Sequence, residues 1–159
     1  MPPPPLPDAP DPDATEVCPG CGAVLAPVGD DVDTHPGASP SCARLFEVTL
    51  RGLREEAATD LPSAATTRLA DAVYDAQHPD PGRPEQVSAA LDRLAADLGA
   101  RPGGRRTQPP PGWTTTIADV AADLDVIDLG VLVDSWARAV LGDWTGAAAD
   151  PATRYGSHR

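Results

Sequence analysis

The sequence predicts a mostly α-helical fold: a small bundle of four to five helices behind an irregular N-terminal segment that resembles a zinc knuckle. Apolar residues recur at helical spacing in several stretches, and no stretch alternates between apolar and polar residues as a half-buried strand does. Glycine and proline recur every few residues over 17–42, and this segment holds all three cysteines of the chain. We therefore expect one metal-stabilised helical domain over 17–144, with residues 17–42 as its knuckle.

The first two helices follow the knuckle. Ser39 is a typical N-cap residue and Pro40 a typical first helical residue, and together with the apolar face behind them they predict a helix over 40–58. A second helix is predicted over 62–77 and has to end near His78, because a proline follows that residue and disfavours the helical conformation before it. The apolar face of the first helix comprises Cys42, Leu45, Phe46, Thr49, Leu50 and Leu53.

The rest of the chain predicts two longer helices and one short one. Apolar residues in helical register predict a helix over 84–98 and the last helix over 128–144. Between these helices, residues 99–112 are rich in proline and glycine and predict a mobile linker inside the domain. A short helix over 116–122 is predicted from a capping-box spacing, with a strand over 113–117 as the alternative.

Both ends of the chain are expected to lie outside the folded domain. Residues 1–16 hold seven prolines in the first twelve positions and predict a disordered, acidic tail, and the small polar residues of 145–159 predict a flexible C-terminal tail. The chain begins with no secretory signal and contains no run of about 20 apolar residues, the length that a membrane span needs. We therefore expect a cytoplasmic protein.

The composition predicts a small apolar core and limits the choice of partners. The chain has 159 residues, 20 prolines, 14 glycines and a formal net charge of −12, from 24 acidic and 12 basic residues. Such a composition is close to that of disordered chains, so that a bound metal would have to supply part of the folding free energy. Because acidic surfaces repel phosphates and anionic lipids, we expect no nucleic-acid partner and no membrane partner, and any protein partner should be neutral or basic.

The cysteines predict a metal site. Cys18 and Cys21 form a Cys-x-x-Cys turn, which can place two sulfurs on one tetrahedral ion, and Cys42 lies in the first turn of a predicted helix, where the helix dipole favours a thiolate. A zinc ion, Zn²⁺, with three thiolates needs a fourth ligand. His35 is the first choice because it lies close by on a Gly/Pro loop, and His78, at the end of the second helix, is the alternate.

Other interpretations of the cysteines fit less well. A thioredoxin-like dithiol needs a buried strand before the motif and a helix starting at it, whereas more loop follows here. A disulfide needs an oxidising compartment, and three cysteines would leave one unpaired. Ordinary reduced thiols are the remaining alternative.

Several motifs resemble a known family in their order and spacing. CPGCGA at 18–23, THPGASPSC at 34–42, Arg-Leu at 68–69 and YDAQHP at 74–79 resemble the bacterial domain of unknown function 5946 over residues 17–144. The resemblance implies a small soluble bacterial protein that binds a metal, and it implies no particular activity.

The chain departs from the family pattern at three places. Thr67 stands where the pattern has a histidine before Arg-Leu, Asp92-Arg93-Leu94 stands where it has His-Leu, and Ala43 replaces a large aromatic residue after the third cysteine. If the missing histidines serve a catalytic metal or proton transfer in relatives, that role is lost here. The ligands that remain form a closed set of three thiolates and one imidazole, which favours a structural metal.

Two functional hypotheses follow. The first is a protein with a structural zinc ion that serves as a protein-interaction or structural module. The alternative is a metal-dependent enzyme in which His78 faces an open position on a Cys-ligated metal, with Asp71 or Asp75 as acid or base. The sequence names no substrate and no particular partner.

Overall fold

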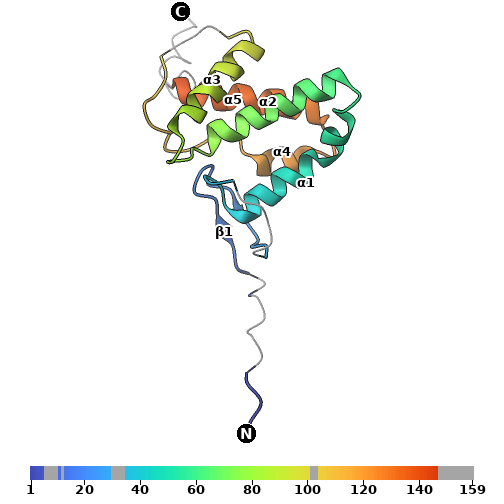
Figure 1. Cartoon of the computed structure of the whole chain (residues 1–159), viewed down its shortest axis with the longest axis vertical. Helices are drawn as coiled ribbons and strands as arrows, with labels where there is room; N and C mark the ends of the chain where they lie inside the picture. The colour runs from blue at the N-terminus through green and yellow to red at the C-terminus, as the bar shows by residue number, and fades with distance from the viewer. Residues whose placement is uncertain (6–10, 12, 30–34, 101–103, 147–159) are drawn as a thin grey trace, which may run out of the picture.

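The computed structural model describes residues 1–5, 11, 13–29, 35–100 and 104–146. Its elements confirm the predicted fold class, five helices with a small two-stranded sheet at the N-terminal end (Figure 1). Parts of the predicted tails and of the predicted linker, residues 6–10, 12, 101–103 and 147–159, lie outside the described residues. The elements are β1 (Glu16–Val17), β2 (Val24–Leu25), α1 (Pro40–Glu56), α2 (Leu61–Gln77), α3 (Pro84–Asp97), α4 (Ile117–Asp123) and α5 (Leu129–Thr145).

The first helices begin and end where local sequence signals place them. The Ser39 side chain accepts a hydrogen bond from the backbone N–H of Cys42 at the start of α1, with Pro40 as the first helical residue. Asp60 caps α2 in the same way. α2 ends at Gln77, and His78 leaves the helical conformation with φ −124° and ψ 71°.

The last helices also follow the predicted signals. Thr116 and Asp119 form the predicted capping box at the start of α4, so that residues 113–117 do not form the alternative strand. Asp128 caps α5, which extends to Thr145 and ends at Gly146 in the left-handed conformation, with φ 72°. Within the described residues, no helix combines the length and the apolar character that crossing a membrane requires.

The core lies around α2, which packs against α1, α3 and α5 (Figure 1). Trp136 and Trp144 of α5 are buried against it, and both indole N–H groups donate to the last turn of α2. The Trp144 indole donates to the carbonyl of Ala76 at 2.8 Å, and the Trp136 indole donates to the side-chain oxygen of Gln77 at 3.1 Å. The C-terminal end of α2 is therefore fixed inside the core.

The short sheet brings the knuckle to the start of α1. β1 and β2 pair antiparallel, with Glu16 opposite Leu25 and Val17 opposite Val24. The Glu16 carboxylate accepts hydrogen bonds from the backbone N–H of Ser41 at 3.2 Å and from its hydroxyl at 2.6 Å. This contact places a negative charge at the N-terminus of α1, where the helix dipole stabilises it.

Candidate metal centre

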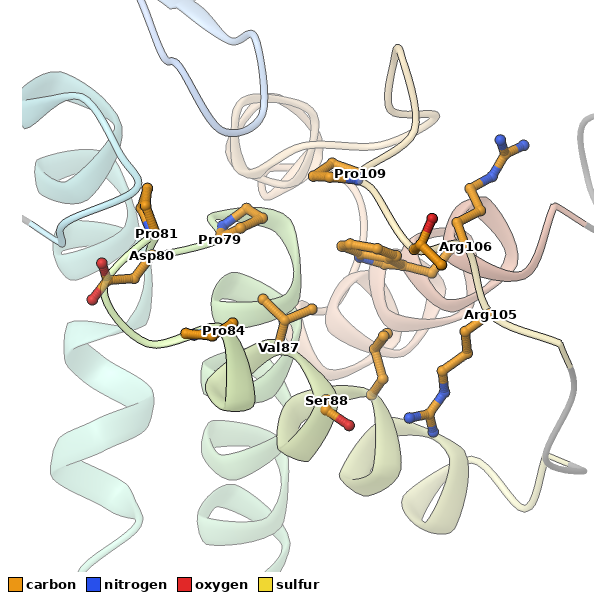
Figure 2. A pocket seen from close by; sticks show the side chains of 12 residues that line it. Pro79, Asp80, Pro81, Pro84, Val87, Ser88, Arg105, Arg106 and Pro109 are labelled. Carbon is orange, nitrogen blue, oxygen red and sulfur yellow. The ribbon is translucent and has the colours of Figure 1, made fainter.

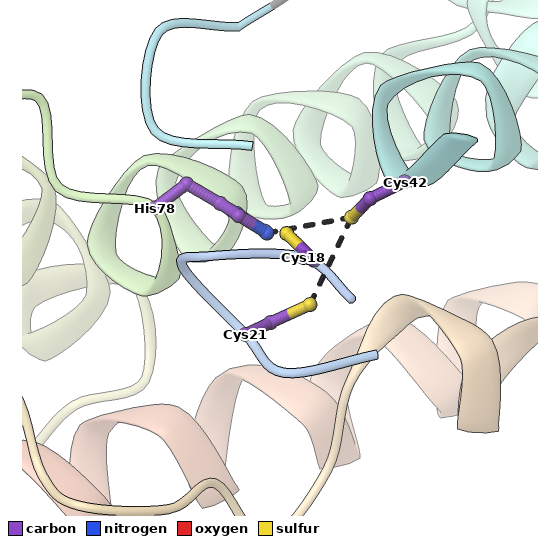
Figure 3. Close-up of side chains that lie close together, drawn as sticks. All are labelled: Cys18, Cys21, Cys42 and His78. Carbon is purple, nitrogen blue, oxygen red and sulfur yellow. Dashed lines mark hydrogen bonds between the residues drawn. The ribbon is translucent and has the colours of Figure 1, made fainter. Parts of the chain in front are cut away.

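Three sulfurs and one imidazole meet in the interior of the protein. Cys18 and Cys21 come from the turn between β1 and β2, Cys42 from the first turn of α1, and His78 from the residue after α2 (Figure 3). Their ligand atoms all lie within 4.8 Å of one another, and all four residues are buried. Three segments that are distant in sequence thus present four typical metal-ligand atoms to one point.

The turn that carries Cys18 and Cys21 is held by its own backbone. The N–H of Gly22 donates to the carbonyl of Cys18, and the N–H of Cys18 donates to the carbonyl of Ala23, both at 2.9 Å. Gly22 has φ +75°, a left-handed conformation that favours glycine, and it lets the chain reverse directly after Cys21. The reversal turns both thiols to the same side.

Each sulfur receives a hydrogen bond from outside the ligand set. The backbone N–H of Ser39 donates to Cys18 Sγ and that of Ala23 to Cys21 Sγ, both at 3.4 Å, and the Tyr74 hydroxyl donates to Cys42 Sγ at 3.3 Å. Burial raises the pKa of Tyr74 above its usual value, which keeps the hydroxyl protonated and able to donate. These three donors stabilise negative charge on the sulfurs.

The orientation of the His78 ring follows from its backbone partner. Its Nδ1 lies 2.7 Å from the carbonyl oxygen of Tyr74, and because a carbonyl only accepts, the ring proton is on Nδ1. Nε2 therefore carries the lone pair, and it points at the sulfurs, 3.4 Å from Cys42 Sγ. A metal-bound imidazole needs this arrangement, with one nitrogen for the ion and the other fixed by an acceptor.

The spacing of the donor atoms fits a tetrahedral ion. With metal–sulfur bonds of about 2.3 Å and a metal–nitrogen bond of about 2.0 Å, two sulfurs lie about 3.8 Å apart and a sulfur and a nitrogen about 3.5 Å apart. Cys21 Sγ and Cys42 Sγ are separated by 3.8 Å, and Cys42 Sγ and His78 Nε2 by 3.4 Å. The Cys/His cluster is compatible with metal binding in its residue types, its burial and its spacing.

The thiols share protons unequally. Hydrogen bonds from the thiols of Cys21 and Cys42 hold the pKa of Cys18 well below its usual range. The hydrogen bond to Cys18 raises the pKa of Cys21 to about 11, and hydrogen bonds to Cys18 and Cys21 together with burial raise that of Cys42. A metal that takes all three sulfurs as thiolates has to displace the protons of Cys21 and Cys42.

His35, the first choice of fourth ligand in the sequence analysis, lies beside the cluster but outside it. Its Nδ1 accepts a hydrogen bond from the N–H of Gly37 at 3.2 Å, and its Nε2 lies 2.9 Å from Asp75 of α2. Both ring nitrogens are therefore engaged with protein groups, and the residue fastens the loop before α1 to α2. The alternate, His78, is the histidine that the structure brings to the three sulfurs.

The loop before α1, which His35 fastens to α2, packs closely against His78. There is no room for a side chain at its Gly37, nor at Gly20 of the hairpin turn. A Cβ atom at Gly37 would lie 2.5 Å from the carbonyl oxygen of His78, and one at Gly20 would lie 2.6 Å from the His78 ring. Trp113 adds a further tie, because its indole N–H donates to the carbonyl of Gly20 at 2.8 Å. Backbone atoms of three segments are thus in direct contact around the imidazole.

Sequence reasoning missed the residues that support the ligands. Tyr74 and Trp113 form hydrogen bonds to Cys42 and Gly20, and the only sequence signal for the first is its position four residues before His78 on a helix. Ser39 was expected as a helix cap, and it also donates its N–H to Cys18.

The structure lends no support to the enzymatic alternative. His78 is buried among the sulfurs, Asp75 pairs with His35, and Asp71 pairs with Arg54 at 2.6 Å. The two carboxylates proposed as acid or base are therefore held by other side chains.

A separate pocket of about 350 Å³ begins one residue beyond His78 (Figure 2). It lies between the α2–α3 connection, α3 and residues 105–109, with Asp80 on one side and Arg105 and Arg106 on the other (Figure 2). Arg105 pairs with Asp92, and Arg106 donates to the backbone carbonyl of Asp143. These bonds hold this part of the predicted linker, residues 105–106, against α3 and α5.

Fold and site together define a small helical protein with a buried Cys3His cluster at the junction of its N-terminal hairpin and its bundle. The model of a family of unknown function, DUF5946, matches residues 16–102 and 97–145, and the chain belongs to this family. The family resemblance drawn from the motifs is thereby confirmed. Comparison with curated proteins and with solved structures finds no match.

The close packing around His78 predicts a strong effect of one added methyl group. Gly37→Ala should destabilise the protein by about 1–3 kcal/mol, because the Cβ atom meets backbone atoms that cannot rotate away. Gly52→Ala in α1 is the matched control: it meets nothing within 4 Å and should stabilise the helix by about 0.5–1 kcal/mol. Urea denaturation of both variants checks this, and equal midpoints would contradict the packing.

Proposed function

We propose that Cys18, Cys21, Cys42 and His78 bind one zinc ion, and that the ion is structural. The observation that carries the proposal is the closed, buried donor set, in which every sulfur has an outside hydrogen-bond donor and the imidazole has a fixed tautomer. Three thiolates and one imidazole in tetrahedral spacing are typical ligands of structural zinc, and they leave no position for a reacting water.

The protein then serves as a zinc-stabilised module that binds a protein partner. A structural zinc site supplies about 10 kcal/mol or more of folding free energy, which compensates for a small apolar core. The net charge of −12 supports a neutral or basic protein as the partner and argues against nucleic acid and anionic membranes. The proposed ligation needs all three cysteines in the reduced state, which fits a reducing compartment such as the cytoplasm.

Metal content distinguishes the two histidines. Protein purified without a histidine tag should contain one zinc ion per chain by elemental analysis, and His78→Ala should lose it, since Nε2 of His78 supplies the fourth bond. His35→Ala is the matched control and should keep the ion, because the ring nitrogens of His35 contact Gly37 and Asp75 instead. Loss of zinc in the His35 variant with retention in the His78 variant would reverse the assignment.

Removal of the metal should unfold the protein. A loss of about 10 kcal/mol is comparable with the whole stability of a domain of this size, so a strong chelator should abolish the helical far-UV circular dichroism at 25 °C. Elemental analysis has to show that the metal has left. A full helical signal in the metal-free protein would sink the structural role.

Zinc affinity should fall steeply as the pH is lowered. In the folded, metal-free protein the thiols of Cys21 and Cys42 have raised pKa values, so both hold a proton at neutral pH. In the unfolded protein the thiols titrate near about 8.5 and are also mostly protonated. In both cases zinc has to displace at least two protons when it binds. Each unit of pH lowered from 8 to 6.5 should weaken binding by about 100-fold or more. Competition with a chelating dye measures this, and a tenfold change per unit would show that one proton is displaced.

A further inference from the structure

We propose that the groove between the C-terminal half of α1 and the N-terminal ends of α2 and α5 binds a basic amphipathic helix of a partner protein. This inference names the interaction surface of the module proposed above and rests on that proposal. The groove and the residues around it, called here the acidic groove, lie on the helical bundle, away from the hairpin that carries Cys18 and Cys21 (Figure 1).

Large apolar side chains at or near the helix ends that form the acidic groove are exposed to water. Leu61 and Val126 are 85% and 81% exposed, Val131 is 60% exposed and Ile127 is 39% exposed. Each is next to, or two positions from, a residue that lines the groove, so the four lie at the N-terminal ends of α2 and α5 or in the connection before α5. An apolar cluster left in water on a chain with so little apolar material is typical of an interaction site.

The groove is formed by the C-terminal half of α1 and the N-terminal ends of α2 and α5. Its volume is about 430 Å³, and the helices are tied together across it: the Ser63 hydroxyl donates to Glu56 at 3.3 Å. A preformed depression between fixed helices loses little conformational entropy when a ligand enters. The lining residues are Thr49, Gly52, Leu53, Glu56, Pro62, Ser63, Thr66, Asp128, Leu129 and Gly130.

The charges near the groove indicate which kind of partner can bind there. Five exposed carboxylates come from the groove lining, from the N-cap of α2, and from the end of α4 and the connection after it, whereas the nearby Arg51 and Arg54 of α1 pair with Glu47 and Asp71. A partner that covers the apolar side chains has to bring positive charge to this rim. The carboxylates belong to Glu56, Asp60, Asp123, Asp125 and Asp128.

The same charges disfavour the other occupants. A second copy of the chain would bring an equal set of carboxylates to the interface and repel the first, and phosphates or anionic lipids would be repelled in the same way. An amphipathic helix with lysines or arginines beside its apolar stripe satisfies both requirements, since its leucines cover the exposed side chains while its cations face the rim.

A designed peptide tests the proposal on the full, zinc-loaded chain. The probe is an 18-residue peptide of leucine and lysine whose leucines share one helical face, and its control has the same composition with the leucines spread around the helix. Isothermal titration calorimetry should give one site of micromolar affinity for the first peptide and at least tenfold weaker binding for the second.

Paired variants locate the site. Leu61→Ser with Val131→Ser should weaken the peptide at least tenfold, and Val126→Ser alone should weaken it measurably. The control, Val17→Ser with Val24→Ser, removes two exposed apolar side chains from the hairpin and should leave the affinity for the peptide unchanged. Asp123→Asn with Asp125→Asn should weaken binding and its dependence on salt, whereas Asp11→Asn with Asp13→Asn, which removes the same charge elsewhere, should not.

Each outcome decides the proposal. Equal binding by the groove variants and the hairpin variants would overturn it, as would a dimer of the free protein that Leu61→Ser dissociates, because the occupant would then be a second copy. Zinc content is measured in every sample. A peptide that binds a zinc-free, folded chain would refute the proposed metal and leave the groove standing, whereas a zinc-loaded chain that ignores the peptide would refute only the groove.

Discussion

The meeting of three buried sulfurs and one imidazole is the constraint on which the rest of the structure depends. The two strands of the hairpin are two residues long, and such a short hairpin is not stable by itself. Its other anchors include the carboxylate of Glu16 on Ser41, the indole of Trp113 on Gly20, and the packing of Ala23 and Leu25 against the core. The cluster adds to these anchors by joining the turn that carries Cys18 and Cys21 to α1 and to the end of α2.

The end of α2 couples this cluster to the hydrophobic core. Three consecutive residues have different partners there: Ala76 accepts from Trp144, Gln77 accepts from Trp136, and His78 turns its imidazole to the sulfurs. A shift of this turn would break buried hydrogen bonds in the core as well as the ligand geometry. The same segment therefore couples the geometry of the Cys/His cluster to the packing of α5.

Much of the fold could be predicted from the sequence because its signals are local. Caps and apolar periodicity placed the five helices, and the Cys-x-x-Cys spacing with Cys42 indicated the sulfurs. The choice between His35 and His78 could not be made locally. Proximity along the chain favoured His35, but its ring meets Asp75, forty residues away, and only the packing of α2 brings that carboxylate within reach. For the same reason the donors to the sulfurs from Tyr74 and Ser39 were not foreseen.

The small number of apolar residues in the chain links the buried, proposed metal site to the exposed apolar side chains. If zinc holds the hairpin and the helix ends together, the fold no longer needs every apolar side chain in its core. Leu61 and Val126 can then remain exposed to water near the N-terminal ends of α2 and α5. A partner that covers them would gain the free energy of burying their apolar surface. If the proposed metal centre is closed, a partner has to bind at the molecular surface, and the helix ends around the acidic groove carry both exposed apolar side chains and carboxylates.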